Sequence, residues 1–581
     1  MAVFKVTTTG LKSGLVALVL ILSGCGGGGS GTSSVAVSST SSSSSSASSD
    51  PASSSSSASS QSSISSSSTT SSSSSVSSSS ASAGPDSVIL SGTLSYDFVP
   101  VTISGLDYDA TEARPIRGAV VNLLGSNGQI LQTTDSGING EYRFEVEANI
   151  QVKVQVEARS FRSGNPSWHL RVEDNTSGNA LYVLEGGLAS SGETDSTRNL
   201  RAASGWAGSG YSQPRAAAPF AILDTTYGVL LQLLEVDPQL SLPVSNFRWS
   251  PLNQPAEGSL AEGEIGTSFY FASNLYILGD EDTDTDEYDR HVIAHEWSHY
   301  LEDKLVDRQD SIGGSHGQSD KLDLRVAFSE GFANAIAAYV LDDPDYIDTS
   351  GFGQRAAGGF DIASANISNP GWFSESSVQS ILYNFAITSG GFNAIYEVLT
   401  HTSYANVDAH LSVFTFADRL QSLAPANYAA FEPLYTAQDI NSTDPFGALE
   451  TNDGDTQGVL PIYGDIQGDG SVVNVCSTQV NGYYNKLGVW KFLKVHFDSP
   501  GEYRLTVERA SAPASRVTDP DFIVSTRGVY VSIGESVEED RETNTFFLNQ
   551  GAEYLVSLYD YTEYDQVSVP TCFDVTLEPV L

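Results

Sequence analysis

The chain has 581 residues, enough for two to four domains, and its 70 acidic and 28 basic residues give a formal net charge of −42. This balance excludes the basic face that nucleic-acid binding requires, and it disfavours electrostatic docking onto anionic lipid head groups. Its ordinary consequence is solubility and mutual repulsion between copies. We therefore expect a multi-domain protein with no nucleic-acid partner.

Residues 1–24 have the features of an export signal. Lys5 and Lys12 make the start positive, and 14–22 is an apolar segment too short to cross a bilayer as a helix. The segment ends in Leu22-Ser23-Gly24-Cys25, which resembles the lipobox of bacterial lipoproteins. That resemblance implies cleavage before Cys25, lipid attachment to Cys25, and an outer-membrane or cell-surface location. An ordinary cleaved signal followed by an unrelated cysteine is the alternative.

Residues 25–86 are rich in Gly and then almost pure Ser, a composition that cannot form a core and is typical of a flexible tether. From 87 to 205 the sequence predicts strands, joined at Asn127-Gly128 and Asn139-Gly140 by hairpin turns. The strand-like runs are 88–90, 118–123 and 142–146. The stretch 115–144 resembles a carboxypeptidase-regulatory-like domain, which implies a β-sandwich and says little about function.

From 206 to 455 the pattern becomes mainly helical. The expected helices span 216–234, 286–305, 323–341, 375–388, 391–399 and 407–422. The run 267–271 is strand-like, and it is either an edge that binds peptide as an added strand or an ordinary core strand.

From 463 to 581 hydrophobic residues again alternate with period two, as in strands. This pattern resembles the pre-peptidase C-terminal domains of secreted bacterial peptidases. Cys476 and Cys572 form an even pair in an exported chain, which favours a disulfide over two free buried thiols.

The motif His295-Glu296-Trp297-Ser298-His299 lies in the second expected helix. Residues four apart share a helix face, so two imidazoles can hold one metal ion while Glu296 faces a water beside it. Asp286 is the expected N-cap of this helix, with Asp289 three residues later. A buried helix with two core histidines is the alternative, but it would leave Glu296 buried without a partner.

A catalytic zinc needs a third protein ligand, and Glu330 is the best candidate because its neighbours predict an apolar helix. Gly331 is costly inside a helix, so we expect it to allow close approach of another backbone. A surface carboxylate is the alternative for Glu330.

An HExxH motif followed by a glutamate on a later helix resembles the gluzincin clan of metallopeptidases. The resemblance implies an α+β zincin-like catalytic domain, here flanked by two β-sandwich domains, and one zinc ion on His295, His299 and Glu330. It also implies a zinc-activated water with Glu296 as general base. In thermolysin-like members an acid four residues after the glutamate orients the first histidine; the matching residue here is Asn334, whose amide can accept the imidazole N–H.

Two residues are candidates for stabilising the transition state. They are His316, in a loop between the two ligand helices, and Tyr383, in the helix expected at 375–388. A polar loop contact and a core tyrosine are the respective alternatives. The acidic run 280–286 could bind calcium, or it could be the solvated start of a helix, favoured by the helix dipole.

The sequence as a whole predicts a secreted, lipid-anchored zinc peptidase that hydrolyses protein or peptide substrates outside the cytoplasm. The rival hypothesis is a non-catalytic surface adhesin or polysaccharide-binding lipoprotein, since a tether and two β-domains would serve either protein. The discriminating feature is the metal site, because a binding module has no need for Glu296.

Overall fold

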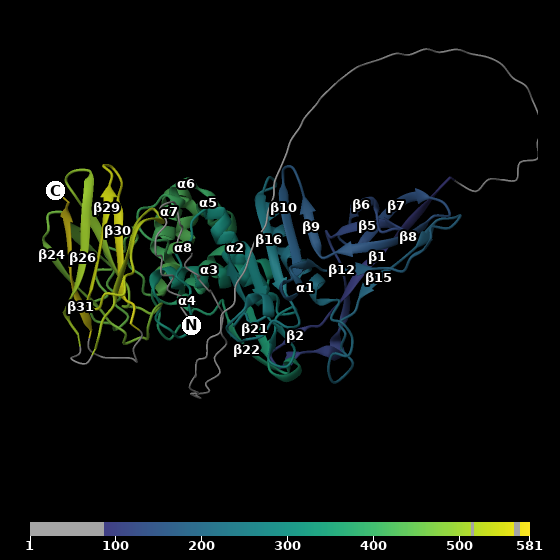
Figure 1. The fold of residues 1–581 in the computed structure, drawn as a ribbon, viewed down its shortest axis with the longest axis horizontal. Coiled ribbons are helices and arrows are strands. Elements are labelled where there is room, and N and C mark those ends of the chain that lie inside the picture. Colours follow the sequence, from purple (N-terminus) through teal and green to yellow (C-terminus); the bar gives the residue numbers. More distant parts are fainter. Residues whose placement is uncertain (1–85, 513–515, 563–569, 581) are drawn as a thin grey trace, which may run out of the picture.

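The computed structural model describes residues 86–512, 516–562 and 570–580. The expected signal segment, Cys25 and nearly all of the Ser-rich tether lie outside the described residues. Figure 1 shows a β-rich body, a mixed central body and a second β-rich body arranged in chain order along the long axis. In the described ranges, no helix has both the length and the apolar character needed to cross a membrane.

The N-terminal body is a β-sandwich of two five-stranded sheets. In one sheet the long strand β1 pairs with each of the other four strands, at different positions along its length. It runs antiparallel to β4 and β7 and parallel to β14 and β15. Its strands are β1 (Ser87–Phe98), β4 (Glu112–Pro115), β7 (Glu141–Glu147), β14 (Ser196–Thr197) and β15 (Leu200–Ala202). The second sheet contains β5 (Val120–Gly125), β6 (Ile130–Asp135), β8 (Gln151–Glu157), β12 (Val183–Glu185) and β13 (Ala189–Ser190). The expected strands fall in β1, β5 and β7.

A six-stranded sheet links the N-terminal body to the central one. Its order is β11-β10-β16-β18-β17, with β9 beside β10, so that strands before and after residue 205 pair in parallel. The sheets therefore do not divide at the boundary expected at 205–206. The strands are β9 (Arg159–Arg162), β10 (Ser167–Asp174), β11 (Ala180–Leu181), β16 (Ser241–Trp249), β17 (Phe269–Phe271) and β18 (Asn274–Ile277). The strand expected at 267–271 is β17, at the edge of this sheet.

Eight α-helices make up most of the central body. They are α1 (Ala218–Val236), α2 (Arg290–Val306), α3 (Leu324–Leu341), α4 (Glu375–Ala386), α5 (Gly391–Thr400), α6 (Thr402–Ala405), α7 (Val413–Leu423) and α8 (Pro425–Ala437). Short two-stranded ribbons complete it: β2 (Val101–Thr102) with β3 (Gly105–Leu106), β19 (Gly279–Asp280) with β20 (Asp284–Thr285), and β21 (Asp345–Ser350) with β22 (Ala356–Asp361). Helix α3 packs between α2 and α4, which buries nearly every residue of α2 and α3.

The start of α2 differs from expectation. The helix begins at Arg290, its N-cap is Asp289, and Asp286 lies outside it. The Asp289 side chain makes no capping bond, because its Oδ2 accepts hydrogen bonds from the backbone N–H and the hydroxyl of Thr349, at 2.9 and 2.8 Å. Hydrogen bonds between the start of α2 and β21 therefore replace the expected cap.

The C-terminal body is a second β-sandwich, with sheet orders β23-β25-β30-β27-β28 and β24-β31-β26-β29. Cys476 and Cys572 lie opposite each other on β24 and β31 and form the expected disulfide. The strands are β23 (Tyr463–Gln467), β24 (Val472–Ser477), β25 (Lys491–His496), β26 (Gly501–Ser511), β27 (Pro520–Thr526), β28 (Val529–Gly534), β29 (Arg541–Leu548), β30 (Tyr554–Asp560) and β31 (Thr571–Pro579).

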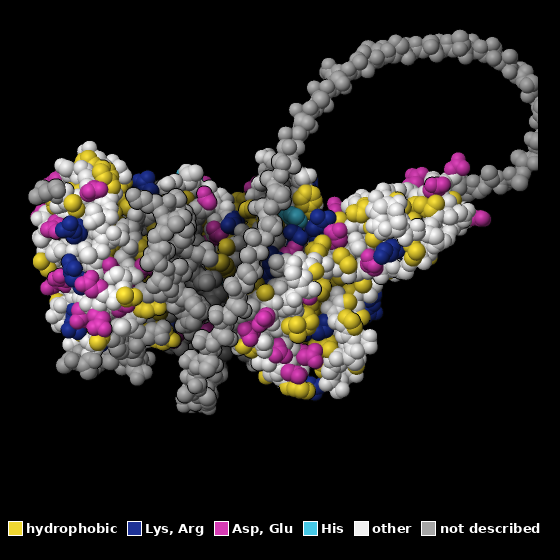
Figure 2. Space-filling model, viewed as in Figure 1, with side chains coloured by type: hydrophobic (Ala, Val, Ile, Leu, Met, Phe, Trp, Pro, Cys, Tyr) yellow, Lys and Arg dark blue, Asp and Glu magenta, His cyan; other side chains and the backbone are white. Residues whose placement is uncertain are grey.

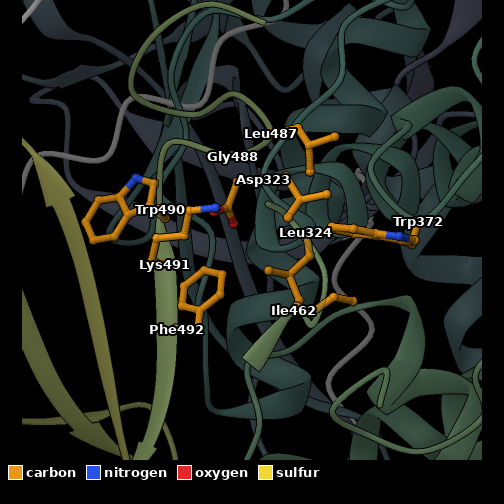
Figure 3. Close-up of a pocket in the computed structure, with 10 residues that line it drawn as sticks. Asp323, Leu324, Trp372, Ile462, Leu487, Gly488, Trp490, Lys491 and Phe492 are labelled. Carbon is orange, nitrogen blue, oxygen red and sulfur yellow. The ribbon is translucent and has the colours of Figure 1, made fainter. Parts of the chain in front are cut away.

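The C-terminal body packs tightly against the start of α3. The buried Arg325 guanidinium lies over the rings of Trp490 and Phe492, at 4.7 and 5.0 Å from their centroids. Figure 3 shows the crevice at this junction, where Trp372 and Leu324 of the central body lie across from the aromatic side chains of the C-terminal body. Such mixed apolar and cation–π contacts favour a fixed junction between the bodies.

Gly331 allows α3 and α4 to approach closely. A Cβ added there would lie 2.5 Å from Val378 Cβ and 2.7 Å from the Glu375 carbonyl oxygen, so something must shift. We predict that Gly331→Ala lowers the free energy of unfolding by about 1–3 kcal/mol through overpacking. Urea denaturation would measure the change. Gly358→Ala is the matched control, since an added Cβ there meets nothing within 4 Å; equal stability of the two variants would contradict the packing argument.

Candidate metal centre

Helices α2 and α3 bring the expected ligands His295, His299 and Glu330 together. One potential ligand atom from each lies within 4.8 Å of the others. The Nε2 atoms of the two histidines are 3.1 Å apart, and they lie 3.3 and 3.4 Å from Glu330 Oε2. The one-turn spacing along α2 aligns the imidazoles, while the close packing of α3 supplies the carboxylate.

All three side chains are fully buried, so the protonation state of each depends on the charges of its neighbours. Burial would lower the pKa of His299, but the Glu330 carboxylate outweighs it and raises this pKa to about 10. Burial likewise opposes ionisation of Glu330, but the neighbouring His316 and His299 hold its pKa well below the usual range. The site therefore favours an ionised carboxylate facing positive charge, which is what a bound cation would supply.

Hydrogen bonds orient both imidazoles from behind. His295 Nδ1 lies 2.8 Å from Asn334 Oδ1, and the Asn334 amide in turn donates to Gln379 at 2.9 Å. His299 Nδ1 lies 3.2 Å from the hydroxyl of Ser329, which donates to Glu302 at 2.6 Å. Such partners fix the ring orientation and tautomer of metal-binding histidines.

Sequence reasoning found Asn334 but missed Glu302, Ser329 and Gln379. Glu302 follows His295 and His299 at helical spacing, seven and three residues on, so it lies on the same face of α2. That spacing is a signal that could have identified it. Ser329 and Gln379 carry no such signal, because their role depends on how α3 and α4 pack.

Glu296 is fully buried, and neither of its carboxylate oxygens has a hydrogen-bond partner among the described residues. Burial raises its pKa to about 8. A buried carboxyl group without partners is costly unless function requires it. Its place between the two histidines on α2 puts it beside the presumed metal position, in keeping with a proton acceptor.

His316 reaches the same site from the loop between α2 and α3. Its Nε2 lies 3.3 Å from Glu330 Oε2, and its Nδ1 lies 2.6 Å from Glu375 Oε2. Burial lowers its pKa, but Glu330 and Glu375 together raise it well above the ordinary value. Gln318 also donates to Glu375, at 2.7 Å. The sequence did not predict Glu375, which lies at the start of α4, far from His316 along the chain.

A loop of the C-terminal body holds the segment that carries His316. The side-chain amide of Asn485 donates to the carbonyl oxygens of Gly313 and Ser315, at 3.0 and 3.2 Å. Lys486 donates to the Ser315 oxygen, and Tyr484 donates to that of Ile312. The position of His316 thus depends on residues more than 160 positions later in the sequence.

Tyr383, the other candidate donor, lies buried on α4. Burial and the acidic residues Asp342, Asp343 and Asp361 raise its pKa. Of the two candidates, the structure brings only His316 to the carboxylate of Glu330.

The donor set fits a zinc ion. Two imidazoles and one carboxylate are a ligand set of catalytic zinc sites, which leave a fourth position open. Both imidazoles are oriented by hydrogen bonds, and the unpartnered Glu296 carboxylate lies on the ligand helix. We therefore take His295, His299 and Glu330 as the residues that would hold the metal.

Comparison with known proteins gives one family match. Residues 248–432, which include α2 and α3, match the Mycolysin C-terminal domain. This match covers less than half of the chain, and it points to a metallopeptidase. No curated protein matches the sequence.

Solved structures give weaker likenesses. The protealysin precursor, a metalloproteinase from Serratia proteamaculans, is 9% identical over 48% of this chain and 88% of its own, with a TM-score of 0.30. A collagenase pre-peptidase C-terminal domain from Bacillus anthracis is 8% identical over 20% of this chain and 93% of its own, with a TM-score of 0.15. A family 35 carbohydrate-binding module from Clostridium thermocellum is 15% identical over 20% and 96%, with a TM-score of 0.13. All three TM-scores are too low to support a shared fold.

Proposed function

We propose that this protein is a zinc-dependent peptidase that hydrolyses peptide bonds outside the cytoplasm, anchored to the cell envelope by lipid on Cys25. One observation carries the catalytic part: His295, His299 and Glu330 converge in a buried site beside the unpartnered carboxylate of Glu296. The family match over 248–432 supports the same reaction class. The anchor rests on the lipobox-like sequence alone.

A zinc ion, when bound, supplies a Lewis acid that makes water acidic near neutral pH and stabilises negative charge on the substrate carbonyl. Glu296 accepts the proton of the attacking water and returns it to the leaving amine. His316, kept protonated by two carboxylates, donates from Nε2 to the oxygen of the tetrahedral intermediate. Asn334 holds the ring of His295 in place.

The substrate would lie along β17. This strand is at the edge of the six-stranded sheet and packs against α2, which carries Glu296. An edge strand offers unpaired backbone groups that bind an extended peptide independently of its sequence. A peptide added there would pass next to the metal centre. The two β-sandwiches would then flank the catalytic body, and neither supplies a presumed ligand.

Glu296→Gln tests the proton acceptor. The amide keeps the size of the side chain but cannot accept a proton, so we expect peptide hydrolysis to fall at least about 10³-fold while one zinc per chain is retained. Cleavage of a fluorogenic peptide library, with and without a chelator, would measure it, alongside zinc content. Glu262→Gln, at an exposed position, is the control. Full activity in Glu296→Gln would rule out the proposed mechanism.

His316→Ala separates two roles for this histidine. If it donates to the substrate oxygen, His316→Ala should lower kcat by about 10²–10³-fold while zinc affinity stays nearly unchanged. If it were a fourth ligand, zinc affinity would fall instead. Zinc competition with a chelator and steady-state kinetics on the same preparation decide between these roles; unchanged kcat would remove His316 from the mechanism.

Variants at Asn334 test whether its hydrogen bond to His295 supports the metal. Its removal frees His295 Nδ1, so Asn334→Ala should weaken zinc binding by about 10–100-fold. Asn334→Asp keeps an acceptor of the same shape and should restore affinity. The measurement is chelator competition on folded protein, checked by circular dichroism. Equal affinities in the wild type and Asn334→Ala would show that this hydrogen bond does not support the metal.

A further inference from the structure

A second cluster of potential ligands lies around the N-terminal start of α2. One carboxylate oxygen from each of Asp284, Asp286 and Asp348 lies within 4.8 Å of the others. Two oxygens bound to one calcium ion at 2.3–2.6 Å can be at most about 5 Å apart, so this spacing allows a shared ion. The aspartates come from β20, the segment before α2, and β21.

Asp286 is buried in this cluster, Asp284 and Asp348 are half-buried, and no positive side chain in the described part of the chain balances their charge. Asp286 is 2% exposed, and the nearby Asp289 is 0% exposed. The Oδ1 atoms of Asp284, Asp286, Asp289 and Asp348 all lack a hydrogen-bond partner among the described residues. Over the same residues, no lysine, arginine or histidine forms an ion pair with any of the four. Buried carboxylates without partners are costly, and mutual repulsion adds to that cost.

Polar neighbours fix the second carboxylate oxygen of Asp286 and of Asp289. Ser268 donates to Asp286 Oδ2, and Thr349 donates twice to Asp289 Oδ2. Each of these residues therefore keeps one oxygen anchored and one oxygen unpartnered. A carboxylate with one oxygen held by hydrogen bonds and one oxygen free is well placed to bind an ion through the free oxygen.

We infer that Asp284, Asp286 and Asp348 bind one calcium ion, separate from the zinc centre. All the donors are carboxylate oxygens, the hard ligands that calcium prefers, and imidazole or thiolate ligands are absent from the cluster as described. Burial and the neighbouring aspartates raise the pKa of Asp284 to about 8, so the ionised carboxylate is unfavourable without positive charge beside it. The solvated helix start considered from the sequence does not describe these residues.

The ion would tie β20 and β21 to the start of α2. Gly351 N–H donates to the Thr283 oxygen at 2.8 Å, so the two turns already lie together. Tyr346 of β21 has its ring 6.4 Å from that of His295. Calcium would thus brace the hairpin that packs beside the metal centre.

The test is calorimetric titration of Ca²⁺ into zinc-loaded, calcium-free full-length protein. We expect one Ca²⁺ per chain with a Kd of about 10⁻⁴ M or tighter, no loss of zinc, and a higher melting temperature. Asp284→Asn with Asp348→Asn should weaken Ca²⁺ binding at least about 10-fold. Asp282→Asn, exposed in the same acidic run, is the control and should bind as the wild type does.

The melting temperature of the calcium-free proteins shows whether the double variant is still folded. Because it removes repulsion, the double variant should melt at or above the temperature of the calcium-free wild type but gain nothing from Ca²⁺. Absence of Ca²⁺ binding by the wild type would overturn the inference, since the cluster would then hold protons instead. Equal Ca²⁺ affinity in the double variant and Asp282→Asn would also overturn it.

Discussion

The buried carboxylate of Glu330 is the interaction on which the central body depends. Three imidazoles approach the same oxygen within 3.4 Å, in a site closed to solvent. A buried charge is tolerated only if its partners are positive or metal-bound. The arrangement requires α3 to lie close to α2 and α4, which explains a glycine at position 331 in the middle of a buried helix.

The two β-rich bodies make contacts that help to position this site. The amide of Asn485, in the C-terminal body, fixes the loop before His316, while the six-stranded sheet ties the N-terminal strands to β17. On the face in Figure 2, acidic and basic side chains are interspersed, and the described residues there form no continuous basic patch. Removing either β-rich body would therefore expose surface of the central body that is now packed, because more than a linker joins the bodies.

The sequence predicted the features that arise from local periodicity. Helical spacing placed His295 and His299 on one face, and apolar spacing placed Glu330 on a second helix. It did not predict Glu375 or Asn485, because these residues meet His316 only through packing of distant segments. The sheet that crosses residue 205 was not predicted for the same reason: pairing of β10 with β16 is a non-local contact without a periodic signal.

The start of α2 shows why local rules failed there. An aspartate before a helix is ordinarily a cap, but here Thr349 donates to one oxygen of Asp289, and the other oxygen has no hydrogen-bond partner among the described residues.

On the proposed assignments, one helix connects two sites with opposite requirements. A zinc ion beside a single carboxylate keeps net positive charge, which polarises water and carbonyl groups. A calcium ion among three carboxylates keeps no net positive charge, so it can serve only to hold chain segments together. The donor atoms account for this difference. Neutral imidazoles leave the positive charge of the catalytic ion available to water and substrate, whereas aspartates cancel the positive charge of the structural ion. The same helix can then be rigid at its start and reactive one turn later.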